Sequence, residues 1–217
     1  MTQALLLYGH PEPDSFNGRL AAAYAQGYRA GGGALERIDL VTLAFDRQLR
    51  AGYRAPQTLE PDLLRVQAAI ERADHLVWVF PTWWAAPPSC VRALVERTFL
   101  PGWAFRYEPK RALPRGLLAG RSARVVMTMD APGWWYSLVQ QRTIHRSFGT
   151  ATLRFCGLRP VAFTAVHGVH GMAEASRQRW CERVAAIATH DARSRAKVLA
   201  HAPAREGLPV PASSPRA

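Results

Sequence analysis

Short runs of consecutive apolar residues, separated by segments with helical spacing, constrain the fold of this chain more than any other feature. Ala4 to Tyr8 and Leu76 to Phe80 are apolar at every position, which is typical of strands buried on both faces of a parallel sheet. Further strands are predicted at 34–41, 123–128 and 160–166. About five strand–helix alternations predict an α/β fold: a doubly wound, five-stranded parallel sheet with helices on both faces.

Capping residues, prolines and glycines mark the expected helices. Ser15 begins a helix rich in Ala and Leu that ends at Gly31-Gly32-Gly33, and Pro61 begins the next one. Later helices are predicted around 91–98, before Cys156, and from about 172 to 189. In this prediction residues 1–201 form one domain, and the Pro- and Ser-rich residues 202–217 form a flexible tail.

The composition excludes several classes of protein. Apolar residues make up 48% of the chain, which excludes intrinsic disorder for most of it. Its apolar runs are far shorter than the roughly 20 residues of a membrane span, and the first residues do not resemble a secretory signal. Cys90, Cys156 and Cys181 have no C-x-x-C spacing, which argues against a disulfide framework or a zinc site and fits a reducing compartment. We therefore expect a cytoplasmic protein without a metal site.

The net charge of +12 is unevenly distributed along the chain. Residues 1–140 carry 16 basic and 12 acidic side chains, whereas residues 141–217 carry 12 and 4. Nearly all the basic residues are arginines, and they occur singly rather than in runs interleaved with aromatic residues. A solvated surface that attracts anionic small molecules is therefore favoured over binding to a nucleic-acid backbone, and we expect no nucleic-acid partner.

The loop after the first strand is a candidate anion site. Ligands of doubly wound sheets bind beyond the carboxyl ends of the strands. Residues 9–17 bring a hydroxyl and an amide to the start of a helix, where free N–H groups and the helix dipole favour a phosphate. The loop contains neither G-x-G-x-x-G nor a Walker motif. The alternative is that Ser15 merely caps the helix and His10 is an ordinary polar residue.

Two later loops are rich in aromatic residues. Trp83 and Trp84 are adjacent and cannot both point into one core, so at least one should line a surface crevice that suits a planar heteroaromatic ligand. Residues 128–136 add a carboxylate and three consecutive aromatic side chains. We interpret the two loops as walls of one cleft. Core packing of the tryptophans and a protein-interaction patch are the alternatives.

Four motifs in order along the chain resemble the flavodoxin-like quinone reductases, the DT-diaphorase group. They are His10-x-x-x-x-Ser15-Phe16-Asn17, Phe80-Pro81-x-Trp83-Trp84-x-x-Pro87, Gly102-Trp103-Ala104-Phe105 and Leu153-x-Phe155-Cys156-Gly157. The resemblance implies a flavodoxin-like fold, a homodimer, and an NAD(P)H-dependent oxidoreductase that reduces quinones or similar aromatic acceptors. The reaction would pass two electrons in ping-pong turnover through a noncovalent flavin, FAD or FMN, with FAD slightly preferred.

The resemblance also implies roles for individual residues. The flavin phosphate would lie against His10, Ser15, Phe16 and Asn17, and the isoalloxazine ring against Pro81, Thr82, Trp83 and Trp84. The third loop would contribute Thr128, Asp130, Ala131 and Tyr136. Tyr136 and Tyr107 are the candidate catalytic residues, and each would act as a proton donor because the ordinary pKa of a phenol is about 10.

Two positions depart from the family pattern. Asp130 and Ala131 stand where the family has a Gly-Gly pair, and we hypothesise that the carboxylate lowers the flavin reduction potential, which potentiometry of Asp130→Asn tests. Arg142 stands in place of the family's active-site histidine, with His145 one helical turn away.

A second class of function is open. Some flavodoxin-like proteins are flavin-binding ancillary subunits of membrane ion-efflux systems, and the basic last third of this chain would suit peripheral docking.

Overall fold

A single five-stranded parallel sheet organises the chain. The computed structural model describes residues 1–52 and 54–201. The strands lie in the order β2-β1-β3-β6-β7, with bounds β1 Gln3–Tyr8, β2 Ala34–Asp39, β3 His75–Pro81, β6 Ser122–Thr128 and β7 Val161–Val166. The direction of winding reverses between β1 and β3, where the carboxyl ends of the strands leave room for a ligand. The predicted doubly wound sheet is confirmed.

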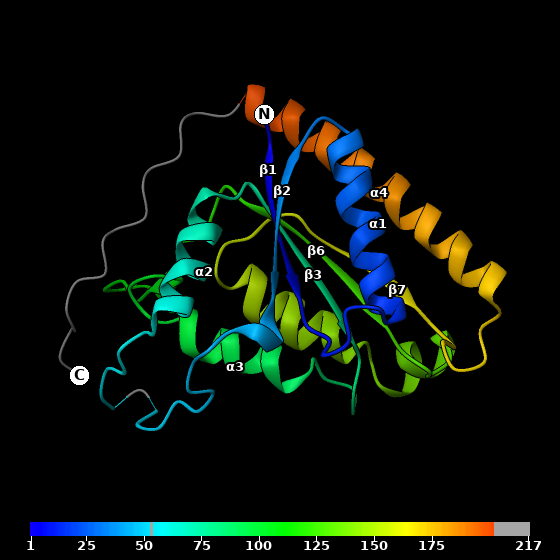
Figure 1. The fold of residues 1–217 in the computed structure, drawn as a ribbon. Coiled ribbons are helices and arrows are strands. Elements are labelled where there is room, and N and C mark those ends of the chain that lie inside the picture. The colour runs from blue at the N-terminus through cyan, green and yellow to red at the C-terminus, as the bar shows by residue number, and fades with distance from the viewer. Residues whose placement is uncertain (53, 202–217) are drawn as a thin grey trace.

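Helices cover both faces of the sheet (Figure 1). The helices α1 (Phe16–Ala30) and α4 (Glu174–Ala200) pack on one face. The other face carries α2 (Pro61–Arg72), α3 (Ser89–Thr98) and two π-helical segments, η2 (Trp135–Val139) and η3 (His145–Arg154). A 3₁₀ turn, η1 (Leu40–Thr42), follows β2, and a short antiparallel pair, β4 (Phe105–Arg106) and β5 (Arg115–Gly116), follows α3.

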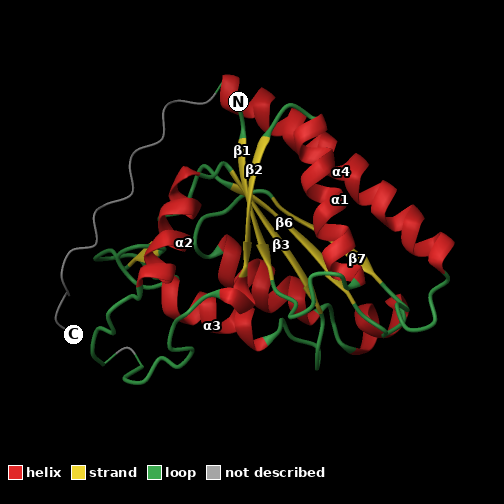
Figure 2. Ribbon diagram, viewed as in Figure 1, coloured by secondary structure: helices red, strands yellow, loops and turns green. Residues whose placement is uncertain are grey.

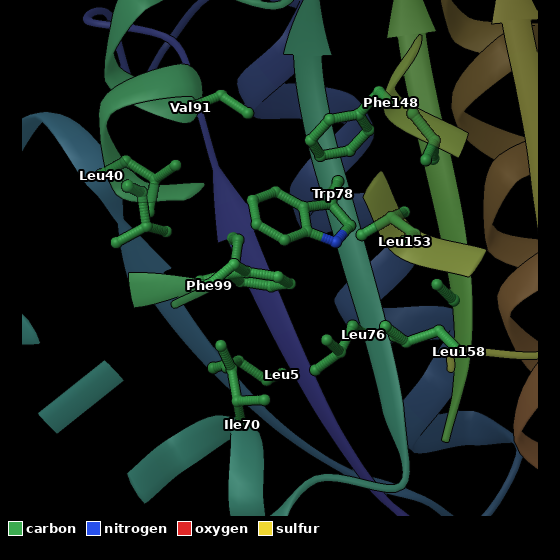
Figure 3. Packing of buried hydrophobic residues seen from close by; sticks show 14 of the residues in the cluster. Leu5, Leu40, Ile70, Leu76, Trp78, Val91, Phe99, Phe148, Leu153 and Leu158 are labelled. Carbon is green, nitrogen blue, oxygen red and sulfur yellow. The ribbon is translucent and has the colours of Figure 1, made fainter. Parts of the chain in front are cut away.

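The larger core lies between the sheet and the α2, α3 and η3 layer. Figure 3 shows Trp78, from the middle of β3, at its centre, with Phe99 and Phe148 beside it. The Trp78 ring is fully buried and lies 5.0 Å from the Phe148 ring, centroid to centroid, in an edge-to-face arrangement. Such aromatic pairs add to the free energy of burying the rings. The packing fixes the position of β3, whose end carries the second loop.

A buried polar network joins the sheet to α1 and α4 on the opposite face. The Tyr24 hydroxyl donates to Asp191 at 2.6 Å, and Asp191 also accepts two hydrogen bonds from the Arg124 guanidinium. His75 lies in the same network, with its Nδ1 2.8 Å from the Ser122 hydroxyl. Burial lowers the pKa of His75 to about 4, so the ring is neutral at pH 7.

The sequence-based boundaries need three corrections. The last helix continues to Ala200 rather than ending near Thr189, because polar contacts of Asp191 and Arg195, rather than an apolar stripe, hold its final turns. The segment before Cys156 is π-helical and divided in two. The β4–β5 pair was not expected, since each strand has only two residues.

The part of the chain that the structure describes contains no helix that is long and apolar enough to cross a membrane. The predicted tail, residues 202–217, lies outside the described residues.

Candidate active site at the carboxyl ends of the strands

Thr128, the last residue of β6, ties together the three loops that the sequence singles out. Its hydroxyl accepts a hydrogen bond from Asn17 Nδ2 at 3.0 Å, and its carbonyl accepts one from the Thr82 N–H at 2.7 Å. Asn17 belongs to the first turn of α1, and Thr82 follows β3 directly. The start of α1 and the second and third loops therefore meet at one edge of the sheet, where Figure 2 shows these strands ending in neighbouring loops.

The first loop holds the start of α1 with unpaired donors. Ser15 is the N-cap residue, and its Oγ accepts the Gly18 N–H at 3.2 Å and lies 2.9 Å from the Tyr8 hydroxyl. A Cβ on Gly18 would lie 1.7 Å from the Pro13 carbonyl, so only glycine allows the loop to pack this closely. Among the described residues, the N–H groups of Phe16 and Asn17 have no acceptor. The cap predicted as an alternative role for Ser15 is present, and the adjacent N–H groups are free to bind an anion.

His10 adds a further polar group beside these N–H groups. Its Nδ1 lies 3.0 Å from the Glu12 nitrogen and 3.2 Å from the Glu12 carbonyl oxygen, so one ring nitrogen is held by the loop itself. Nε2 has no hydrogen-bond partner among the described residues. The His10 ring lies 5.8 Å from the Trp83 ring, which places the first and second loops in contact.

The second loop exposes both of its tryptophans. Trp83 is 47% exposed and Trp84 is fully exposed, so neither indole packs in the core. Trp84 and Ala85 have φ angles of 50° and 57°, the left-handed conformation at two non-glycine residues in succession. Reciprocal backbone hydrogen bonds between Trp83 and Ala86 hold this tight turn. Such strain is found at binding sites, where the surrounding structure maintains it.

A buried hydroxyl at the base of the second loop lacks a partner. Thr82 Oγ1 is buried and makes no hydrogen bond to any described residue. The residue follows Pro81, the buried last residue of β3. Leaving a hydroxyl buried and unpaired costs roughly 1–3 kcal/mol, so a ligand that hydrogen-bonds Thr82 would recover this free energy.

The third loop packs against the turn that follows β7. Asp130 is exposed, and its Oδ1 accepts the His170 N–H at 2.7 Å. The Ala131 carbonyl lies 3.2 Å from His167 Nδ1. Asp130 therefore has a structural contact of its own, which a Gly-Gly pair would lack, and its second carboxylate oxygen remains available.

Tyr136 lies below the third loop, in a pair with His145. Its ring is 2% exposed, and its hydroxyl is 3.0 Å from His145 Nδ1. Burial raises the pKa of Tyr136, while burial and then Arg142 lower the pKa of His145. The phenol therefore stays protonated beside a neutral imidazole. Positive φ angles at Gln141 and Arg142 turn the chain so that His145 returns to Tyr136.

Tyr107 lies apart from this group within one chain. Its side chain is 71% exposed, and its ring contacts Phe105 edge-on. It follows β4, which pairs with β5, and among the described residues its ring has no contact with the three loops. The structure thus brings together the predicted site residues of the three loops and leaves Tyr107 outside.

Sequence reasoning did not assign His145 or His167 to the site. His145 follows Tyr136 by nine residues, a spacing that a regular helix would not bring into contact, and only the irregular turn at 141–142 does so. The His167 ring is 5.9 Å from the Tyr136 ring. The signal that could have found His167 is its place directly after the last strand of the sheet.

Comparison with known proteins bears on this geometry. A protein-family model described as a flavodoxin-like fold matches residues 2–189. The chain belongs to the flavodoxin-like family. It is 24% identical over 196 residues to NAD(P)H dehydrogenase [quinone] 1 of Cavia porcellus, covering 78% of this chain and 70% of that protein. It is also 24% identical over 213 residues to ribosyldihydronicotinamide dehydrogenase [quinone] of Rattus norvegicus, covering 85% and 91%.

Solved structures share the fold. NAD(P)H:quinone oxidoreductase from Methanothermobacter marburgensis superposes with a TM-score of 0.73 at 20% identity, covering 88% of this chain and 98% of that one. An FMN-dependent NADH-azoreductase from Bacillus anthracis, in complex with FMN, gives 0.68 at 16% identity, covering 88% and 100%.

A shorter match, 26% identity over 101 residues, covers 46% of this chain and 49% of the glutathione-regulated potassium-efflux system ancillary protein KefF of an Enterobacter strain.

The resemblance drawn from the motifs is confirmed, and the chain is an oxidoreductase of this flavodoxin-like family. Its residues also fit a flavin. The free N–H groups at the start of α1 suit a phosphate, the unpaired Thr82 hydroxyl suits a polar edge of the ring, and the exposed indoles suit its apolar faces.

Proposed function

We propose that the protein is an NAD(P)H-dependent flavin oxidoreductase that reduces quinones. The observation that carries the proposal is the junction at Thr128, which gathers a helix N-terminus with free N–H groups, a partnerless buried hydroxyl and exposed tryptophans at one edge of the sheet. The names of the relatives supply the substrate class, since they are quinone dehydrogenases.

The chain's own groups have distinct roles in this proposal. The first turn of α1 and His10 Nε2 hold the phosphate of the flavin, and Thr82, with the Trp83 and Trp84 indoles, holds its ring. A flavin held there would supply two-electron chemistry between a reduced nicotinamide and an acceptor. Tyr136 keeps its proton because burial raises its pKa, and the phenol is a donor toward the acceptor oxygen. His145 orients that phenol through the 3.0 Å contact.

The site is completed in a homodimer in this proposal. Among the described residues Tyr107 has no contact with the three loops of its own chain, and its exposed ring is available to a second copy. Exposed apolar side chains surround the candidate site and form the surface for this contact: Trp84, Trp134, Trp135, Leu138 and Val139. Such a cluster of large apolar side chains marks an interaction surface.

Steady-state kinetics test the activity. We expect NAD(P)H oxidation with menadione as acceptor to give parallel double-reciprocal lines, the pattern of ping-pong turnover in which both substrates use the same site in succession. Reduced ribosylnicotinamide should be tested as a second electron donor, because one relative is named a ribosyldihydronicotinamide dehydrogenase. The proposal is refuted if none of these reduced nicotinamides supports turnover under any condition. Identification of the released flavin decides between FMN, which is bound in the azoreductase structure, and FAD.

The ancillary-subunit function is the second candidate, and the match to KefF favours it over about half of the chain. It predicts a bound flavin with negligible turnover and activation of a membrane efflux system. Both functions place the protein in the cytoplasm. The enzyme is the stronger candidate because the quinone dehydrogenase relatives match a larger share of the chain.

A further inference from the structure

The outer face of α4 carries a straight row of positive charge. Arg179, Arg183, Arg193 and Lys197 are all exposed, and we call these four residues the basic row. At about 100° per residue they lie within roughly 40° of one line along the helix. The buried residues of α4 lie on the opposite side of the helix: Val184, Ala188, Ala192 and Arg195. The basic row therefore points directly away from the protein, along the helix that forms the outer edge of the ribbon in Figure 1.

The basic row has no acidic partner within the described chain. Arg179 and Arg183 are four residues apart, as are Arg193 and Lys197. None of these four side chains forms an ion pair with a described residue. Like charges at this spacing destabilise a helix slightly. On α3, by contrast, Arg92 and Glu96 have the same spacing and form an ion pair at 3.0 Å.

The carboxylates of α4 offset only part of this row. Glu174 pairs with Arg19, and Asp191 points inward to Arg124. Glu182 is exposed near Arg183, where its charge opposes one of the four cations, and it accepts a hydrogen bond from Gln178. On α1, the helix beside α4, the exposed residues are Ala22, Gln26, Arg29 and Ala30, and none of them is acidic. Four exposed cations against this one carboxylate leave the face with a net positive charge.

We propose that the basic row docks the protein on an anionic lipid bilayer. The four cations extend over 18 residues of helix, or about 27 Å at 1.5 Å per residue, in a straight line. A flat bilayer presents anionic headgroups along the whole line, whereas a curved nucleic-acid duplex presents phosphates to only part of it. The row contains no large apolar side chain, so the contact is electrostatic and lies at the headgroups, without insertion. This surface is distinct from the candidate site and independent of the proposed function.

Vesicle sedimentation of the full-length protein tests the proposal. We expect binding to vesicles of phosphatidylcholine with about a third phosphatidylglycerol at low salt, release at about 0.5 M salt, and no binding to pure phosphatidylcholine. Each cation near such a surface strengthens partitioning about fivefold, so replacing all four residues of the basic row by Gln should weaken it by two orders of magnitude or more.

A matched variant separates the row from net charge. Four exposed basic residues outside α4, each without an ion pair among the described residues, are Arg47, Arg54, Lys110 and Arg159. Their replacement by Gln removes the same charge and should reduce partitioning less than a tenth as much. Circular dichroism and thermal melting confirm that both variants fold. The proposal is overturned if the wild type does not bind anionic vesicles or if the two variants lose binding equally. It is also overturned if the protein binds a DNA duplex and not the vesicles.

Discussion

At the scale of single residues, the Thr82 hydroxyl tests the candidate site, because it is a buried, unpaired polar group that lies in one of the three loops. It is buried without a partner, and the Thr98 hydroxyl, also buried, donates to the Leu94 carbonyl at 2.6 Å. We expect Thr82→Val to raise the free energy of unfolding of the flavin-free protein by about 1 kcal/mol and to weaken flavin binding about tenfold. Chemical denaturation and flavin titration measure the two effects.

Thr98→Val is the control for this prediction, because it makes the same change where the hydroxyl has a partner. It should lower the free energy of unfolding by about 1 kcal/mol and leave flavin affinity unchanged. If Thr82→Val destabilises the flavin-free protein as much as Thr98→Val does, the Thr82 hydroxyl has a role in folding rather than in binding.

The Tyr136 hydroxyl carries the proposed proton donation. Tyr136→Phe keeps the buried ring and removes the contact with His145. We expect kcat for quinone reduction to fall by at least about tenfold with KM little changed, since general-acid catalysis is worth about 10²–10⁴-fold and other donors remain. Tyr28→Phe, on the opposite face of the sheet, is the control and should leave kcat unchanged. An unaltered kcat in Tyr136→Phe would remove the phenol from the mechanism.

At the scale of elements, the polar network around His75 holds α4 against the sheet. Folding keeps His75 neutral down to about pH 4, whereas the unfolded chain binds the proton near pH 6.5. Between these values the unfolded state holds more protons, so the free energy of unfolding falls as the pH falls from 6.5 to 4. The full effect of His75 is about 3 kcal/mol.

Urea denaturation as a function of pH measures this dependence. His75→Gln has no titrating ring and should reduce the slope between pH 6.5 and 4, although it also lowers stability at pH 7 through its lost contacts with Tyr24 and Ser122. Equal slopes for the wild type and His75→Gln would show that other groups cause the acid sensitivity.

Elements defined by local sequence could be predicted, and elements that depend on distant contacts could not. The strands at 4–8 and 76–80 and the helix after Ser15 follow directly from apolar runs and a capping residue, and the structure has them. The last turns of α4 could not be predicted in this way, because they depend on Asp191 meeting Arg124, 67 residues away. The Tyr136–His145 contact was equally inaccessible, since it requires two left-handed residues between two π-helical segments.

The candidate site was predictable to the extent that local motifs define it. The three loops were identified from their positions after strands, and the structure joins them at Thr128. What the sequence could not provide is the spatial relation between loops. Tyr107 and Tyr136 were both predicted to be catalytic residues, yet within the described chain they have different neighbours and no contact with each other, so their cooperation depends on the proposed dimer.

At the scale of the whole molecule, the two proposed contact surfaces involve different elements. The apolar side chains proposed for the dimer lie around the candidate site and the basic row lies on α4, so the proposed dimer and the proposed membrane contact do not compete. Light scattering after size exclusion should give about 48 kDa, twice the chain mass of 24.0 kDa. Leu138→Glu places a charge among these apolar side chains, where Leu138 is 75% exposed, and should yield the monomer.

Leu64→Glu is the control for the dimer, because Leu64 is 52% exposed on α2, outside the apolar surface. This variant should remain at about 48 kDa. A wild type that elutes at 24.0 kDa at all concentrations would contradict the dimer and, with it, any role of Tyr107 in catalysis.

The central claim is that the edge of the sheet around Thr128 binds a flavin. The direct measurement is the absorption spectrum of the purified full-length protein after addition of flavin and removal of the excess, followed by chromatography of the released cofactor. We expect a band near 450 nm, one flavin per chain, and loss of affinity in Thr82→Val. A colourless protein that retains neither FMN nor FAD would contradict the account.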